Sequence, residues 1–253
     1  MSTTYTNTGL VKHAQAALKL KTKYMWGGIL RLIEKQYDLL MSIYGINPDI
    51  GYTKERWNEL AQLKYKDVYA VDCVGLIKSY YWSGNPNGGV GSKMYCSDEY
   101  PDVSAVTMFE KAKNKGPIST LPERPGVIVF CKSHPHVGIY IGNGYTIEST
   151  LGSRGDGVVK RKLDSLWEYW FECPYISYAA ETTTTAKTKK CTLAFPAKVR
   201  SEPKLSASQL GRLTAGATVT IIIGSETKDT VSGNEYVRLS GEAERWIVKS
   251  AIK

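Results

Sequence analysis

Several features that define common classes of protein are missing from this 253-residue chain. No apolar run is long enough to span a bilayer, and the first residues lack the basic and apolar regions of a secretory signal. The five cysteines are odd in number and have no paired spacing, which argues against a disulfide framework. Zinc-finger spacing, an RNA-binding signature and a phosphate-binding glycine loop are also absent. The sequence therefore predicts no membrane anchor, no resident metal or organic cofactor, and no nucleotide site.

The charge is unbalanced, with 33 Lys and Arg residues against 24 Asp and Glu residues, a net charge of +9. The excess is spread over the whole chain and forms no compact basic stripe. An acidic polymer is a natural partner for such a protein. Anionic wall polymers fit this charge, whereas nucleic acid is not the expected partner without a recognition motif.

A candidate nucleophile lies at Cys73. Residues 74–82 have the apolar spacing of a helix, and Asp72 is a suitable cap for its first turn. Cys73 would then lie at the helix N-terminus, where backbone N–H groups and the positive end of the dipole stabilise a thiolate. The same N–H groups can stabilise an oxyanion. The alternative is that Cys73 is a small buried side chain with no chemical role.

A candidate base follows at His136. Residues 127–131, 136–141 and 145–149 read as strands, and Gly142-Asn143-Gly144 reads as a hairpin loop. A three-residue loop with Gly144 in the left-handed conformation puts Glu148 on the same face as His136, within reach of the imidazole. A two-residue loop would invert that face. We therefore predict a Cys73–His136–Glu148 triad, in which Glu148 orients and charges His136.

These motifs resemble the NlpC/P60 family of papain-like cysteine peptidases from bacterial cell walls. The resemblance covers roughly residues 10–175 and rests on four segments in the family's order: Tyr24-Met25-Trp26-Gly27-Gly28, Asp72-Cys73-Val74-Gly75-Leu76, Arg124 to Phe130, and His136 to Gly142. It implies an α+β catalytic domain with helices packed on an antiparallel sheet. It also implies that Tyr24 borders the oxyanion site and that Asp72 and Trp26 lie at the substrate.

The chain departs from the family in two places. Val74 replaces the serine that usually follows the nucleophile, and the spacer between Gly28 and Asp72 is much longer than usual. We expect residues 29–70 to form a helical insertion, with helices at 29–43 and 52–63. This insertion either covers the cleft or helps to bind the glycan, or it adds extra core.

A second domain is expected after a polar linker at residues 181–191. Residues 192–253 contain short strand-like runs separated by turns, which suit a small barrel. Their order resembles a bacterial SH3 domain, and this resemblance implies an anchor for peptidoglycan. Tyr236 and Trp246 are candidate wall contacts, although the alternative is that both are core residues. A domain that only stabilises or spaces the enzyme is the other reading.

The sequence thus predicts a two-domain peptidoglycan hydrolase that uses a thiol to cleave a peptide bond in the stem or cross-bridge. An N-acetylmuramoyl-L-alanine amidase with the same triad is one alternative, and a non-catalytic wall-binding or toxin-like protein is another. Without a signal peptide, we expect synthesis in the cytoplasm and action on the wall after release, as for a phage endolysin that depends on a holin.

Overall fold

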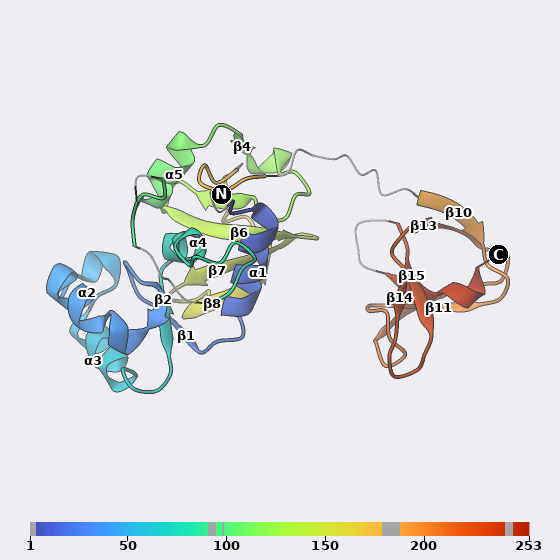
Figure 1. Ribbon diagram of the computed structural model, residues 1–253, viewed down its shortest axis with the longest axis horizontal. Coiled ribbons are helices and arrows are strands. Elements are labelled where there is room, and N and C mark those ends of the chain that lie inside the picture. The colour runs from blue at the N-terminus through green and yellow to red at the C-terminus, as the bar shows by residue number, and fades with distance from the viewer. Residues whose placement is uncertain (1–3, 91–94, 98, 179–187, 241–244, 253) are drawn as a thin grey trace. The chain divides into compact units, whose positions relative to one another are not determined.

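The computed structural model describes residues 4–90, 95–97, 99–178, 188–240 and 245–252, and it divides the chain into two compact units (Figure 1). The first unit comprises residues 1–179 and the second residues 180–253. The protein is α+β, with helices, a six-stranded antiparallel sheet and a small mixed sheet in the first unit and mainly strands in the second. None of the described helices has the length and apolar character needed to cross a membrane.

The first unit is built on a six-stranded antiparallel sheet with the order β4-β9-β5-β6-β7-β8. Its strands are β4 (Lys115–Pro117), β5 (Ile128–Cys131), β6 (His136–Gly142), β7 (Tyr145–Thr150), β8 (Gly157–Lys162) and β9 (Tyr169–Phe171). Every residue of β5 is buried, as its continuous apolar sequence predicts for a central strand.

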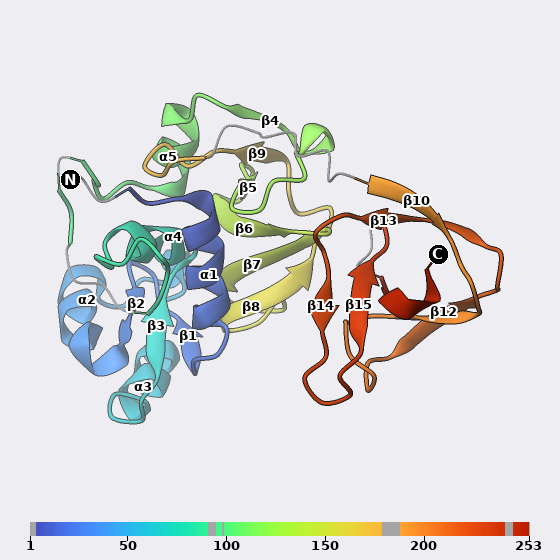
Figure 2. The same cartoon turned by 45° about the vertical axis from the view of Figure 1, so that its right-hand side comes forward.

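Helices α1 (Asn7–Ala17) and α4 (Cys73–Tyr81) pack on this sheet (Figure 2). Helix α5 (Ala105–Lys111) lies near the edge of the sheet that β4 and β9 form. Every residue of α4 is buried, because the helix packs against α1 as well as the sheet. The Asp72 side chain accepts a hydrogen bond from the Gly75 N–H and caps α4, as predicted from the sequence. The first helical residue is therefore Cys73.

The insertion has a small sheet and a core of its own. Strands β1 (Thr22–Tyr24), β2 (Ile29–Leu32) and β3 (Tyr69–Val71) form a three-stranded sheet with β3 at its centre. Between β2 and β3 lie η1 (Ile33–Lys35), α2 (Tyr37–Tyr44), η2 (Pro48–Ile50) and α3 (Lys54–Gln62). The prediction of one helix over residues 29–43 was wrong, because residues 29–32 pair with β3 as a strand.

The hairpin between β6 and β7 differs from the predicted one, but the strands keep the expected facing. The loop has two residues, Asn143 and Gly144, and both have positive φ, at 55° and 71°. A bulge between Tyr140 and Gly142 adds one residue to β6 and restores the alternation that a two-residue loop would have inverted. Since Ile139 pairs with Ile147, the same register places Gly138 opposite Glu148.

The second unit consists of two sheets packed around a small apolar core. One sheet pairs β10 (Thr188–Thr192) with β13 (Thr218–Ile222); the other has the order β12-β11-β16-β15-β14. These five strands are β11 (Ala197–Arg200), β12 (Gln209–Leu213), β14 (Thr227–Lys228), β15 (Glu235–Arg238) and β16 (Trp246–Val248), and η4 (Lys249–Ala251) follows. Over the described residues the sheets do not close into the expected barrel. Residues 188–191, assigned to the linker from sequence, belong to β10.

Candidate active site

The thiol of Cys73 lies at the first residue of α4, where the chain leaves β3. Gly75 allows this arrangement, because a Cβ there would lie 2.0 Å from the carbonyl oxygen of Gly28. The backbone of the Trp26–Gly28 turn therefore packs directly on the first turn of α4. Both oxygens of Asp72 are used in this junction, one by the N–H of Gly75 at 2.5 Å and the other by the N–H of Gly27 at 2.7 Å.

Asp72 is consequently a structural carboxylate. Asp72 is buried, and burial raises its pKa above the usual range. The charge of Lys78 and the two N–H donors lower this pKa, but burial outweighs them. The role in oxyanion or substrate binding expected from the family resemblance is not the one its contacts favour. Asp72 instead fixes the backbone that carries Cys73.

His136 and Glu148 meet as the predicted triad requires. His136 Nε2 and Glu148 Oε2 lie 2.5 Å apart, and the Glu148 side chain is 0% exposed. Because Nε2 faces the carboxylate, Nδ1 is the ring nitrogen left for the thiol. The thiol of Cys73 interacts electrostatically with the imidazole and contributes to its raised pKa, so the three groups lie together.

The electrostatics around His136 favour a charged imidazole. Burial alone lowers the pKa of His136, but the hydrogen bonds and negative charges of Cys73 and Glu148 outweigh it and raise the pKa to about 9. The pKa of Glu148 shifts in the opposite direction. Burial raises its pKa, yet hydrogen bonds from His136 and Arg154 hold it below the usual value. The pair is therefore an imidazolium and a carboxylate at neutral pH.

Arg154 holds the second oxygen of Glu148, a contact that the sequence analysis did not identify. Its Nη2 lies 2.7 Å from Glu148 Oε1, while Nη1 lies 2.7 Å from Asp164 Oδ2. Arg161 Nε is more distant, at 3.8 Å from Glu148 Oε1. A fully buried carboxylate is costly without a cation, so Arg154 supplies the compensation that lets Glu148 remain ionised.

Trp167 covers one face of the imidazole. Its ring stacks on His136 with centroids 5.5 Å apart and planes at 16°, and the guanidinium of Arg154 lies 5.9 Å from its centroid. Gly138 makes room for this ring, since a Cβ there would lie 2.9 Å from Trp167. Gly138 therefore accommodates an aromatic ring that fixes the imidazole.

Tyr24 lies beside the nucleophile, as the family resemblance implies. Burial, together with the negative charges of Cys73 and Asp72, raises the pKa of Tyr24 far above its ordinary value. Tyr24 therefore stays a neutral donor. Its backbone is held by Asp156, which accepts from the Tyr24 N–H at 3.0 Å, and by Arg56, which donates to the Tyr24 carbonyl at 2.5 Å.

Arg56 belongs to α3 of the insertion and forms two hydrogen bonds with Asp156, at 2.7 and 2.8 Å. The insertion also has an independent aromatic core, in which Tyr52 stacks on Trp57 with centroids 4.2 Å apart. It thus adds core, as one of the sequence alternatives proposed. It also fixes Tyr24 beside the thiol.

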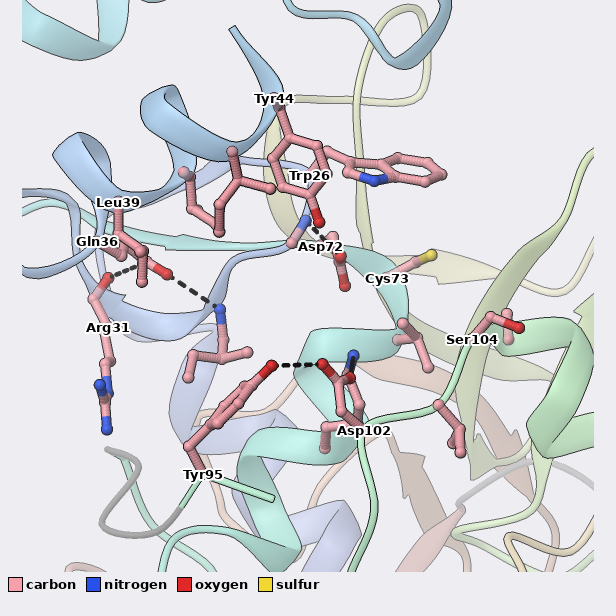
Figure 3. Close-up of a pocket in the computed structure, with 18 of the residues that line it drawn as sticks. Trp26, Arg31, Gln36, Leu39, Tyr44, Asp72, Cys73, Tyr95, Asp102 and Ser104 are labelled. Atoms are coloured by element: carbon pink, nitrogen blue, oxygen red, sulfur yellow. Dashed lines mark hydrogen bonds and ion pairs between the residues drawn. The ribbon is translucent and has the colours of Figure 1, made fainter.

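A cavity of about 790 Å³ opens beside Cys73 (Figure 3). Trp26, which is 38% exposed, lies at this cavity together with Asp72 and Cys73. The opposite walls come from α2 of the insertion and from residues 102–106 before and within α5. The insertion therefore lines the cavity that contains the nucleophile. Its covering of the cleft and its binding of the glycan both stay predictions.

The two aromatic residues suggested as wall contacts are buried in the second unit. Tyr236 is 2% exposed and Trp246 is 9% exposed. Both therefore correspond to the alternative reading, in which they are core residues, because a buried ring presents no surface to a polymer. The other four cysteines, Cys96, Cys131, Cys173 and Cys191, are free thiols like Cys73, and only Cys96 among them is exposed.

The residues that the structure describes contain no group of three His, Cys, Asp or Glu side chains able to hold a metal ion. Within this part of the chain, His136 is engaged by a carboxylate and a thiol. The candidate site is therefore organised as a thiol beside a hydrogen-bonded imidazole and carboxylate.

Comparison with known proteins adds little to this description. No family model matches the chain, and no curated protein matches its sequence. Among solved structures, the chain is similar to "The crystal structure of Ly7917", with 15% identity over 70% of this chain and 82% of that chain and a TM-score of 0.22. It is also similar to "The crystal structure of Ly7917 with the hydrolyzing product of MDP", at 16% identity over 70% and 83% of the two chains, with a TM-score of 0.23. Scores this low carry no argument about fold or function.

Proposed function

We propose that this protein is a cysteine peptidase that hydrolyses a peptide bond in peptidoglycan. The observation that carries the proposal is Cys73 at a helix N-terminus, with its thiol acting on the pKa of His136, and the hydrogen bond between His136 and the fully buried Glu148. A nucleophile within reach of a base, and a base oriented by a third group, is the arrangement that thiol hydrolases require. A helix carrying the thiol and packed on an antiparallel sheet carrying the histidine is also the arrangement expected of a papain-like domain.

The proposed reaction begins with a thiolate on Cys73 and a proton on His136. The sulfur attacks the substrate carbonyl, and the N–H groups at the start of α4 other than that of Gly75, which donates to Asp72, receive the developing oxyanion. The neutral hydroxyl of Tyr24 is a second donor at this position. His136 then gives its proton to the leaving amine, and water, activated by the same imidazole, releases the acyl group from Cys73.

The polymer is inferred from the sequence resemblance rather than from the geometry. The four motifs shared with NlpC/P60 peptidases point to the stem peptide or cross-bridge, and the net charge of +9 suits an anionic wall. For the second unit, we propose an SH3-like wall-binding module. Its short strands and separate core support an independent module, and its binding surface must involve residues other than Tyr236 and Trp246.

Muropeptide analysis tests the catalytic proposal. Purified peptidoglycan is incubated with the wild type, Cys73→Ala and Cys96→Ala, and the products are identified by mass spectrometry. We expect new peptide amines with the wild type and the exposed-thiol control, and none with Cys73→Ala. A new L-Ala amine alone would identify an amidase. Unchanged cleavage by Cys73→Ala would refute the thiol mechanism.

Wall pull-down tests the second unit. Residues 180–253, which include β10, are compared with residues 1–179 for binding to purified walls. We expect the second fragment to bind and the first to hydrolyse soluble muropeptides but to bind walls poorly. Equal binding by the two fragments would contradict this assignment.

A further inference from the structure

The loop between β7 and β8 carries two charged residues that act on different parts of the site. Residues 151–156 form this loop, and within it the guanidinium of Arg154 lies 2.7 Å from Glu148 Oε1. Two residues further on, Asp156 accepts a hydrogen bond from the Tyr24 N–H at 3.0 Å. The anionic end of the triad and the tyrosine beside the thiol therefore depend on the placement of one short segment.

The insertion holds this loop at Asp156. Arg56 of α3 donates to both oxygens of Asp156, at 2.7 and 2.8 Å, and also to the Tyr24 carbonyl. Lys23 of β1 lies 2.7 Å from Asp156 Oδ2. Glu59 of α3 closes a ring of alternating charges, because it lies 2.7 Å from both Lys23 and Arg56. Each member of the ring therefore faces two charges of opposite sign.

Two further contacts place the same loop against the insertion and β1. A Cβ at Gly51, in the insertion, would lie 3.2 Å from the side chain of Leu151 at the start of the loop. Gly157 follows the loop with a φ of 112°, and a Cβ there would lie 2.6 Å from the carbonyl oxygen of Thr22. Contacts with the insertion and with β1 therefore determine the path of the loop.

Asp156 is ionised in this setting. Burial raises its pKa, but the hydrogen bonds from Arg56 and Lys23 outweigh burial and hold the pKa below its usual value. The Asp156 side chain is only 26% exposed, so water screens these contacts in part. A carboxylate fixed by two cations and a backbone N–H orders its neighbours in the chain, which include Arg154.

We propose that Asp156 is a positioning residue, through which the insertion holds Tyr24 and Arg154 in place. The inference rests on the proposed function, and it gives the insertion a role in the reaction itself. Tyr24 supplies a donor for the oxyanion, so a small displacement of this residue weakens the stabilisation of the transition state. Arg154 balances the charge of Glu148, so its displacement leaves more negative charge beside the imidazole.

Asp156→Asn tests this role. The asparagine keeps an oxygen that can accept from the Tyr24 N–H, but its NH₂ group faces the donors of Arg56 and Lys23. On a soluble muropeptide we expect kcat to fall about tenfold with little change in KM, which is part of the loss that removal of one oxyanion donor causes. The pKa of His136, measured by NMR and assigned with His136→Gln, should rise.

The direction of this shift separates positioning from a direct effect of charge. The charged groups that face His136, directly or through its carboxylate partner, are Cys73, Glu148, Arg154 and Arg161. Removing the negative charge of Asp156 would by itself lower the pKa of His136. Displacing Arg154 raises this pKa, because the remaining negative charge favours the protonated imidazole.

Asp38→Asn is the matched control. Asp38 also forms an ion pair of the insertion, with Lys64 at 2.9 Å, and its side chain is 78% exposed. This variant should leave both kcat and the imidazole pKa unchanged. Circular dichroism and the unfolding midpoint verify folding. If Asp156→Asn does not fold, Arg56→Lys replaces it, because a lysine keeps the charge but loses the planar fork that reaches Asp156 and Tyr24 together. It should produce both changes.

The outcomes for the positioning role and for the peptidase are distinct. A raised pKa of His136 with no peptide cleavage by the wild type would preserve the positioning and refute the proposed peptidase. Cleavage by the wild type with neither change in the folded variant would preserve the peptidase and refute the positioning. In an active enzyme, either change without the other would also overturn the proposal, because the loop would then serve only one of the two residues.

Discussion

Glu148→Gln is the most informative perturbation of the proposed triad. In the wild type, one carboxylate oxygen faces His136 and the other accepts from Arg154. A glutamine has one carbonyl oxygen and one amide NH₂ group, so it can accept from His136 or from Arg154 but not from both. If the carbonyl oxygen accepts from His136, the amide NH₂ group faces the N–H donors of Arg154. If the oxygen accepts from Arg154, the imidazolium of His136 has no acceptor.

The expected loss depends on pH. The pKa of His136 is about 9 in the wild type, because the interactions with Cys73 and Glu148 outweigh burial. If removal of the charge returned it to the ordinary value of about 6.5, the protonated fraction at pH 8 would fall by about thirtyfold, but at pH 6 it would hardly change. Because the interaction of His136 with Cys73 is retained, thirtyfold is an upper limit for the fall in the protonated fraction.

The assay is the pH profile of kcat/KM on a soluble muropeptide, together with the pH profile of iodoacetamide alkylation of Cys73. Because a raised imidazole pKa keeps the proton up to higher pH, the alkaline limb of the wild-type profile should move down in Glu148→Gln. Circular dichroism and the unfolding midpoint give the control for folding. An unchanged alkaline limb, or the same fold-loss at pH 6 and pH 8 in a folded variant, would refute the assigned electrostatics.

Three further predictions concern residues outside the triad. Arg154→Ala removes the cation that stabilises the anion left when His136 loses its proton, so the alkaline limb of the same pH profile should move up, with Arg154→Lys restoring the wild-type position in part. Arg56→Ala removes the donor to the Tyr24 carbonyl and should lower kcat at least tenfold, with a smaller change in KM; an unchanged kcat would show that the α3 contact is irrelevant to catalysis. His13 is buried, and burial lowers its pKa from 6.5 to about 4. Between about pH 6.5 and pH 4 the unfolded chain is therefore protonated at His13 more readily than the folded chain, so acid destabilises the folded protein. Urea unfolding should therefore show up to about 3 kcal/mol more stability lost over this range in the wild type than in His13→Gln; identical losses would place the acid sensitivity elsewhere.

The sequence identified much of the site because the signals for it are local. Capping of α4 depends on Asp72 and the N–H of Gly75, three residues away, so a short motif is enough to place Cys73 at a helix start. The shared face of His136 and Glu148 follows from alternation along two adjacent strands. Even here the loop length was wrong, and the facing survived because of a bulge at the end of β6.

What the sequence by itself determined was therefore the type of the elements with strong local signals, such as α4, β6 and β7, and the pairing of groups joined by a turn. The tertiary structure decided which distant side chains complete the site. Arg154, Trp167 and Arg56 reach their partners through packing between separate elements, and no periodicity in the sequence marks such contacts. The same reason explains Tyr236 and Trp246, whose burial depends on tertiary packing within the second unit and not on their neighbours in the chain.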